Sequence, residues 1–223
     1  FQVFKEIIDA YANWTLAQIQ YNFMDIENQA GRQGVEYAAG KGVAVVVMEP
    51  IRGGLLAKQP PEVVADLWQR APHGWSRAEW ALQWVWNQPE VSVALSGMST
   101  MVQVVENVAS ASRSAPGKLD AADLALIDQV RVAYRGLSPI PCTQCGYCQP
   151  CPNGVLIPEI FRVYNEATMY GDQNIGRFRY SGPMGIKPEQ RADQCVECGE
   201  CEEKCPQNVK VIDWLKKVHS ALG

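Results

Sequence analysis

All eight cysteines of this 223-residue chain lie in two segments, Cys142-Thr-Gln-Cys145-Gly-Tyr-Cys148-Gln-Pro-Cys151-Pro152 and Cys195-Val-Glu-Cys198-Gly-Glu-Cys201-Glu-Glu-Lys-Cys205-Pro206. In each segment the first three cysteines follow one another with two residues between each consecutive pair, and a fourth cysteine is followed by proline. Three thiolates at this spacing form a short loop around three corners of a cubane cluster, whose fourth ligand comes from elsewhere. The two segments therefore predict two [4Fe–4S] clusters bound by eight cysteines.

The fourth ligands can be assigned by comparison with bacterial ferredoxins, which both segments resemble. In two-cluster ferredoxins the last cysteine of each motif ligates the other cluster. On this pattern Cys205 completes the cluster of the first segment, and Cys151 completes the cluster of the second. The first segment departs from the pattern, because two residues separate Cys148 from Cys151 where three are usual. This shorter gap leaves the ligand-sharing scheme open.

Zinc sites and disulfide bonds are the alternatives for these cysteines. Two zinc sites could use eight cysteines, but zinc sites are usually built from separated pairs, and a third cysteine at the same spacing is surplus to a pair. Disulfide bonds would need an oxidising compartment, and nothing in the sequence indicates export. The spacing favours iron–sulfur clusters over both.

The composition is ordinary for a globular protein, with 47% hydrophobic and 20% charged residues. A net charge of −4 gives no reason to expect binding to nucleic acid or to an anionic membrane. No apolar run approaches the roughly 18–20 residues of a membrane-spanning helix, and we expect neither a signal peptide nor a membrane partner. We predict a cytoplasmic protein. Because Phe1 opens the chain inside a helical pattern, we also expect a piece of a longer protein.

The first part of the chain alternates between strand and helix patterns. The continuous apolar run over 43–48 is typical of a buried parallel strand, and residues 16–23 and 91–96 are expected to form two more strands. Helices are expected over 1–12, over 26–40, after Ser76, and from Ser99 or Thr100 to Val108. This alternation over residues 1–110 predicts a parallel sheet or a TIM-type barrel.

Two local features refine the helix that follows Ser76. The sequence Ser76-Arg-Ala-Glu79 has the form of a capping box, in which serine and glutamate side chains bond to the first-turn backbone. The tryptophans within this helix, Trp80, Trp84 and Trp86, have mixed spacing. We interpret them as packing residues rather than as a binding platform.

The remaining pattern predicts where the cysteine-containing part begins. Residues 111–117 form a connector, and a helix capped by Asp120 is expected over 119–134. A boundary after Gly136 divides the chain into domains 1–136 and 137–223. Between the cysteine segments, the sequence predicts a helix over 158–169, with proline in its first turn, and a long loop over 171–193.

Three motifs occupy the expected strand ends: Gln18-Ile-Gln-Tyr-Asn22, Met48-Glu-Pro-Ile-Arg-Gly-Gly54, and Ser96-Gly-Met-Ser99 followed by Glu106-Asn107. In this order and spacing they resemble the last three strand ends of an aldo/keto reductase barrel. The cysteine segments make the chain similar to the subgroup with a C-terminal ferredoxin-like extension. The resemblance implies an α/β fold: the C-terminal portion of a (β/α)8 TIM-type barrel, then a small, mostly α, ferredoxin-like two-cluster Fe–S module.

The resemblance also implies NAD(P)-binding roles at the strand ends, where TIM barrels place their sites. Gln18 would hold the nicotinamide carboxamide and Met48 would stack on the nicotinamide ring. The loop residues Ile51, Gly53 and Gly54 would lie near the pyrophosphate, and Glu106 and Asn107 would contact the adenine end. The alternatives are a buried Gln18 amide bonded to backbone, a simple turn at Gly53-Gly54, and an exposed helix polar group at Asn107.

Two departures from the family are expected to matter. NADP-dependent members place a lysine and an arginine near the last strand and its helix, but the matching residues here are Gly97 and Gln103, which leaves NAD versus NADP open. The family's catalytic Asp, Tyr, Lys and His lie in the first half of the barrel, and this chain begins after that half. We therefore expect no catalytic residue in this chain, and no activity of this chain alone.

The function implied by the resemblance is oxidoreduction of a small-molecule carbonyl or alcohol. Nicotinamide transfers two electrons as hydride whereas a cluster carries one, so coupling the two would need a flavin between them. The clusters would then connect the barrel to a ferredoxin-type redox partner, or they would be structural. An electron-transfer subunit without catalytic chemistry is the alternative function. The βα pattern of residues 1–110 argues against it, because a bare ferredoxin needs no barrel.

Overall fold

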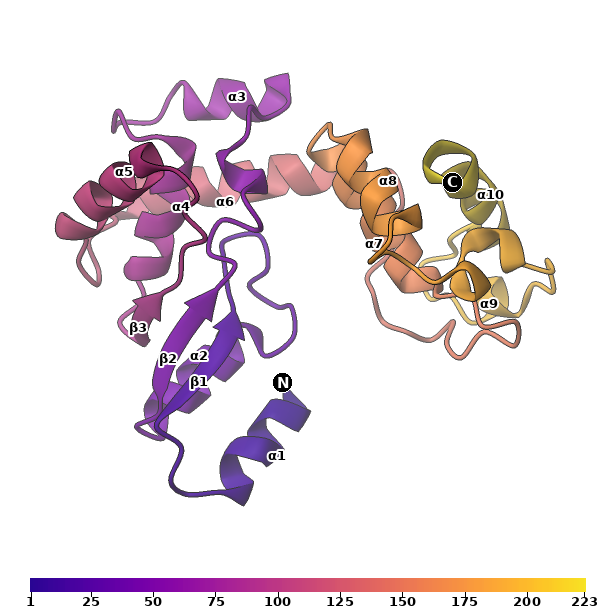
Figure 1. The fold of residues 1–223 in the computed structure, drawn as a ribbon, viewed down its shortest axis with the longest axis horizontal. Helices are drawn as coiled ribbons and strands as arrows, with labels where there is room; N and C mark the ends of the chain where they lie inside the picture. Colours follow the sequence, from indigo (N-terminus) through magenta and orange to yellow (C-terminus); the bar gives the residue numbers. More distant parts are fainter. The chain divides into compact units, whose positions relative to one another are not determined.

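The computed structural model describes all residues from 1 to 223, and they form two compact units, 1–131 and 132–223 (Figure 1). The division falls within α6 (Ala121–Gly136), whereas the sequence pattern places the boundary at the end of this helix. The first unit also contains, in order, α1 (Gln2–Ala10), β1 (Leu16–Gln20), α2 (Gly31–Gly40), β2 (Ala44–Met48), η1 (Leu55–Ala57), α3 (Glu62–Trp68), α4 (Arg77–Trp86), β3 (Val91–Ala94) and α5 (Met101–Ser112).

The first unit is built on a three-stranded parallel sheet in the order β1-β2-β3. Helix α2 connects β1 to β2, and η1, α3 and α4 lie on the connection from β2 to β3. Since parallel strands need such crossovers, the carboxyl ends of all three strands lie at one edge of the sheet. This arrangement is the predicted α/β pattern of a partial barrel, and the strands occur where the sequence predicts them.

One face of the sheet is covered and the other is partly open. In β1, Ala17 and Ile19 are buried while Leu16 and Gln18 are exposed. In β2, Val45 and Val47 are completely buried. The alternate residues Ala44, Val46 and Met48 are half-buried. The strand expected over 43–48 therefore has one completely buried face and one half-buried face.

The last three helices of the first unit, α4, α5 and α6, begin at side-chain caps, whereas α1, α2 and α3 have none. Ser76 Oγ accepts a hydrogen bond from the Glu79 backbone N–H, but the Glu79 carboxylate accepts from Arg113 Nε at 2.6 Å instead of closing the box. A complete capping box lies at α5, where Thr100 and Gln103 bond to each other's backbone. Asp120 Oδ1 accepts from Ala122 and Asp123 N–H and caps α6 as predicted. Helix α3 was not predicted.

The second unit is mostly helical. It contains α7 (Ile157–Met169), α8 (Gln173–Ser181), η2 (Pro188–Gln190), η3 (Ala192–Gln194), α9 (Glu200–Glu203) and α10 (Val211–Leu222). Buried residues of α7 and α10, including Ile160, Phe161 and Leu215, form its core, and most of the cysteines pack against this core. The prediction of a loop over 171–193 is wrong, because α8 and two 3-10 turns occupy it. Helix α10 was also not predicted.

The helices of this chain are too short or too polar for one to cross a lipid bilayer.

Candidate functional site

A cleft of about 1120 Å³ opens at the carboxyl ends of β2 and β3. Its walls come from the loop after β2, the first turn of α4, the loop after β3 and the start of α5. Six of the seven residues with predicted cofactor contacts lie in these walls, namely Met48, Ile51, Gly53, Gly54, Glu106 and Asn107. The fold thus brings together side chains that are far apart in the sequence.

The seventh residue, Gln18, does not line the cleft itself but contacts Met48, which does. Its amide Nε2 donates to Met48 Sδ at 3.2 Å, and its side chain is exposed at the open face of the sheet. The alternative of a buried amide bonded to backbone is therefore wrong. In the parallel register Gln18 pairs with Val46, and Gln20 pairs with Met48. Gln18 and Met48 therefore lie on neighbouring strands, two positions apart in the register.

The loop after β2 turns sharply where the sequence places its glycines. Arg52, Gly53 and Gly54 have φ values of 53°, 61° and 85°, and such left-handed backbone is readily adopted by glycine. Within this loop the Arg52 N–H donates to the Glu49 carbonyl and the Gly54 N–H donates to the Ile51 carbonyl. The glycines therefore form a turn, and this turn lines the cleft; their contact with a pyrophosphate stays a prediction.

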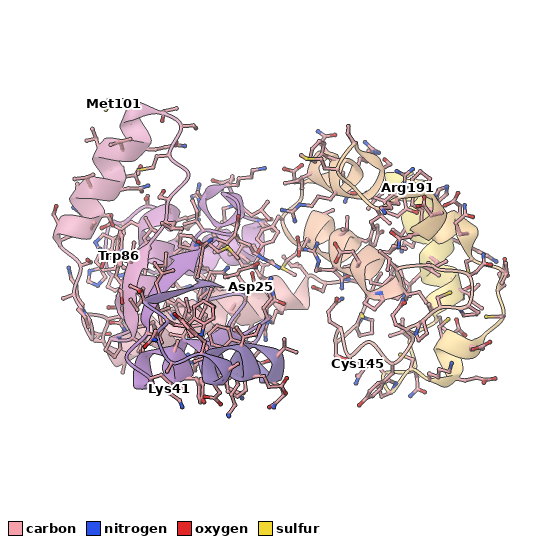
Figure 2. The ribbon with its side chains drawn as sticks, turned by 60° about the horizontal axis from the view of Figure 1, so that its bottom comes forward. Asp25, Lys41, Trp86, Met101, Cys145 and Arg191 are labelled. Carbon is pink, nitrogen blue, oxygen red and sulfur yellow. The ribbon has the colours of Figure 1, made fainter.

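A buried polar network fixes this loop to the end of β1. Asn22 is completely buried, and its Nδ2 donates to the Glu49 carbonyl at 3.0 Å and to Asp25 Oδ2 at 3.1 Å. Arg52 Nε donates to the same Asp25 oxygen at 3.0 Å, and Asp25 is labelled in the centre of the unit in Figure 2. Because Arg52 pairs with the Asp25 carboxylate, this carboxylate is buried without leaving its charge unpaired.

The opposite end of the cleft is held by contacts between α4, α5 and β3. Ser76 Oγ donates to Glu106 Oε1, and Asn107 Nδ2 donates to Ser96 Oγ at 3.0 Å. Asn107 is half-buried, so it is more than an exposed helix polar group. Gln103 Oε1 accepts from the N–H groups of Ser99 and Thr100, and is thus occupied in helix capping.

Several cleft residues have no counterpart in the sequence prediction. Trp68 and Trp75 join Trp80 in the cleft wall, and the Trp75 and Trp80 rings lie 4.7 Å apart. Trp80 and Trp84 are buried as expected for packing residues. Arg77, the first residue of α4, also lines the cleft and is the only Lys or Arg among its lining residues.

The cysteines gather around two small cavities in the second unit. One cavity is lined by Cys142, Cys145, Cys148 and Cys205. The other is lined by Cys151, Cys195, Cys198 and Cys201, and Cys148 reaches its edge. Each cavity therefore combines cysteines from both segments. No three His, Cys, Asp or Glu side chains converge on a position for a single metal ion.

The two cysteine loops have left-handed backbone at two corresponding positions, on either side of the second cysteine. Gln144 and Glu197 precede the second cysteine of their segments with φ of 61° and 58°. Gly146 and Gly199 follow that cysteine with φ of 79° and 85°. The shorter gap after Cys148 does not change this shared feature, although Cys148 lies in a turn and Cys201 lies in α9. Cys145, labelled in Figure 2, and Cys198 are the exposed member of each loop.

Burial raises the pKa of the Cys142 and Cys148 thiols and raises the pKa of Cys201 to about 11. The cause is desolvation, which disfavours the thiolate. Without a cluster these thiols keep their protons at neutral pH, and binding of thiophilic iron releases them. The donor set, four soft sulfur ligands around each of two cavities, fits a [4Fe–4S] cluster in each.

Comparison with known proteins agrees with this two-part organisation. Residues 4–132 match the model of the aldo/keto reductase family, which is more than half of the chain. The chain belongs to the aldo/keto reductase family. Residues 141–210 also match the 4Fe-4S dicluster domain, so both parts of the predicted resemblance are confirmed.

Solved structures similar to this chain include the aldo-keto reductase AKR11C1 from Bacillus halodurans in its holo and apo forms. Each is 25% identical in sequence with a TM-score of 0.45, over 56% of this chain. The chain spans less than half of their length, 46% of the holo form and 47% of the apo form. The comparison with curated proteins found no match.

Proposed function

We propose that this chain supplies the nicotinamide cofactor cleft and the iron–sulfur module of a cytoplasmic oxidoreductase of the aldo/keto reductase type. The enzyme transfers hydride between NAD(P) and a small carbonyl or alcohol. The observation that carries the proposal is the cleft, which gathers six of the seven predicted cofactor residues at the carboxyl ends of the strands. Ligands of parallel α/β folds bind at this edge.

Different residues of the chain are proposed to bind different parts of the cofactor. The Gln18 amide and the Met48 thioether, already in contact, orient the nicotinamide ring. The loop at Gly53-Gly54 lets the backbone approach the pyrophosphate, and Glu106 and Asn107 receive the adenine end. When bound, the nicotinamide supplies or accepts the hydride. No residue of this chain is assigned as the catalytic acid or base.

The cysteine cavities are proposed to hold two [4Fe–4S] clusters with shared ligands. Cys142, Cys145, Cys148 and Cys205 would bind one, and Cys195, Cys198, Cys201 and Cys151 would bind the other. Exposure of Cys145 and Cys198 leaves one edge of each cluster site near solvent, where a ferredoxin-type partner could exchange single electrons. Coupling to hydride chemistry would require a flavin in the complete enzyme, since the clusters transfer one electron each.

The first test is nucleotide binding by the chain with its clusters assembled under anaerobic conditions. We expect about eight iron and eight sulfide per chain, and quenching of tryptophan fluorescence by NADH or NADPH, because Trp68, Trp75 and Trp80 line the cleft. Met48→Asp should weaken the quenching, because it removes the side chain proposed to stack on the nicotinamide ring. The matched control Met184→Asp, at an 86% exposed position of the other unit, should leave it unchanged.

The alternative function, an electron-transfer subunit without its own chemistry, gives a different result. It requires the full iron and sulfide content with no nucleotide binding by the wild-type chain. Two zinc ions per chain instead of iron would contradict both functions.

A further inference from the structure

The two cysteine segments differ in charge. Residues 142–152 contain no charged side chain, whereas residues 195–206 contain four glutamates and one lysine. The cavities repeat this difference, because charged residues line only the one that contains Cys151, namely Glu200 and Lys204. We call the cavity with Cys142, Cys145, Cys148 and Cys205 the first site, and the cavity with Cys151, Cys195, Cys198 and Cys201 the second site. Two sites with the same sulfur ligands therefore lie in different electrostatic surroundings.

The contrast is sharpest at the residue before the second cysteine of each segment, Gln144 in the first and Glu197 in the second. Both residues have left-handed backbone, with φ of 61° and 58°. The Gln144 amide Nε2 donates to Cys142 Sγ at 3.6 Å and to the Pro158 carbonyl at 3.0 Å. Sulfur is larger than oxygen and accepts hydrogen bonds at longer distances. The first site therefore has a side-chain N–H donor directed at one of its own ligands.

The matching residue of the second site has the opposite character. The Glu197 carboxylate is an acceptor only and has no N–H to offer a sulfur. It pairs with Lys216 Nζ of α10 at 2.9 Å, and both side chains are more than half exposed to solvent. Solvent screens an ion pair of this kind, so the two charges attract each other weakly. Glu197 thus supplies a negative charge, partly offset by Lys216, at the position where Gln144 supplies a donor.

The other glutamates of the second segment add to this difference. Glu200 pairs with Lys204 at 3.1 Å on the same helix, α9. The Glu202 carboxylate accepts a hydrogen bond from the Ile212 N–H at 3.0 Å, which fixes its position without neutralising its charge. Glu203 is exposed, and neither Glu202 nor Glu203 forms an ion pair. Two negative charges therefore remain uncompensated beside the second site, and the first segment has no equivalent of them.

Reduction adds one negative charge to a [4Fe–4S] cluster, whose potential depends on net charge, hydrogen bonds to the sulfurs and solvent exposure. An amide N–H stabilises the added charge, and a nearby carboxylate repels it. We propose that the first site has the higher reduction potential, and that Gln144 and Glu197 set much of the difference. This inference rests on the clusters of the proposed function and adds the order in which they are reduced. One electron taken from a ferredoxin-type donor, which is itself oxidised by one electron, then resides at the first site.

The test is an anaerobic redox titration of the cluster-loaded chain, followed by cluster absorbance and electron paramagnetic resonance. We expect two one-electron steps at different potentials. Gln144→Glu should lower the higher step by about tenfold in the reduction equilibrium, or about 59 mV for one electron. Glu197→Gln should raise the lower step by a similar amount. Each new residue already occupies the matching left-handed position of the other loop, so the backbone accommodates both substitutions.

Two further variants separate local from general charge effects. Glu203→Gln removes an exposed, unpaired carboxylate and should raise only the lower step. The matched control Gln173→Glu adds a charge at an exposed position of α8 outside both cavities, and should leave both steps unchanged. Iron and sulfide analysis establishes that each variant has assembled its clusters.

Three results would contradict the proposals, and they are distinguishable. Equal potentials of the two clusters in the wild-type chain would overturn the inference. A shift of the lower step by Gln144→Glu would also overturn it, because the first site would then be the harder one to reduce. Absence of iron from the wild-type chain would instead contradict the proposed function, on which the inference rests.

Discussion

Asn22 shows how a single buried amide shapes the cleft. Its Oδ1 accepts from the N–H groups of Met24 and Asp25 at 3.0 Å, and its Nδ2 donates to the Glu49 carbonyl. The side chain thus bonds the end of β1 to the loop that lines the cleft. We expect Asn22→Ala to lower the free energy of unfolding of the first unit by about 2–4 kcal/mol, because buried donors and acceptors lose their partners.

Urea denaturation followed by tryptophan fluorescence measures this loss, since six of the seven tryptophans precede residue 132. The matched control is Asn28→Ala, which changes an exposed asparagine of the same loop and should shift stability by less than about 0.5 kcal/mol. Equal effects of the two substitutions would show that the Asn22 network is not what holds the loop.

The sequence predicted some of the cleft residues and missed others. Met48 and Glu106 were predicted because they stand in short motifs that resemble those of the aldo/keto reductase family, one at the end of β2 and one within α5. Trp75 and Arg77 were missed, because the path of residues 55–76 over the strand ends is a tertiary property. The capping signal at Ser76 did predict that a helix begins at Arg77, but it could not predict that this turn lines the cleft.

At the scale of elements, α8 is the clearest failure of the sequence pattern. Its sequence Gln173-Asn-Ile-Gly-Arg-Phe-Arg-Tyr-Ser181 is polar and contains glycine, both typical of a loop. In the structure Gly176 has a different function, because an added Cβ would lie 2.6 Å from Ala167 Cβ and 3.1 Å from Leu222 Cδ2. The glycine allows α7, α8 and α10 to pack closely, and long-range packing of this kind leaves no periodic signal in α8.

This packing predicts opposite effects for two Gly→Ala substitutions in helices. Gly176→Ala should destabilise the second unit by about 1–3 kcal/mol through overpacking, although alanine favours helix. Gly40→Ala, the matched control at the end of α2, meets no atom within 4 Å and should stabilise the first unit by about 0.5 kcal/mol. Thermal unfolding measures both, with cluster absorbance reporting on the second unit. A neutral or stabilising Gly176→Ala would refute the close approach.

At the scale of the whole molecule, the two-part organisation could be predicted because each part carries motifs of its own. Strand-end motifs occur only before residue 110 and cysteines only after residue 141. The exact boundary could not be read from sequence, since α6 continues through it as one uninterrupted helical pattern. Helix α10 escaped prediction even though Val211, Leu215, Val218 and Leu222 form a regular buried stripe, a signal that periodicity alone could have detected.

The ligand-sharing scheme is a property of the whole second unit, because each cavity joins segments that lie on either side of α7 and α8. Pairs of substitutions distinguish it from a scheme in which each segment binds its own cluster. If ligands are shared, Cys142→Ser with Cys205→Ser removes two ligands of one cluster, and about four irons remain. Cys142→Ser with Cys151→Ser then damages both clusters, and iron falls toward zero. If ligands are not shared, the results are reversed: Cys142→Ser with Cys151→Ser leaves about four irons, and Cys142→Ser with Cys205→Ser loses nearly all iron. Iron and sulfide analysis of both double variants, prepared in parallel under anaerobic conditions, therefore decides between the schemes, and it does so whether or not the enzyme's substrate is known.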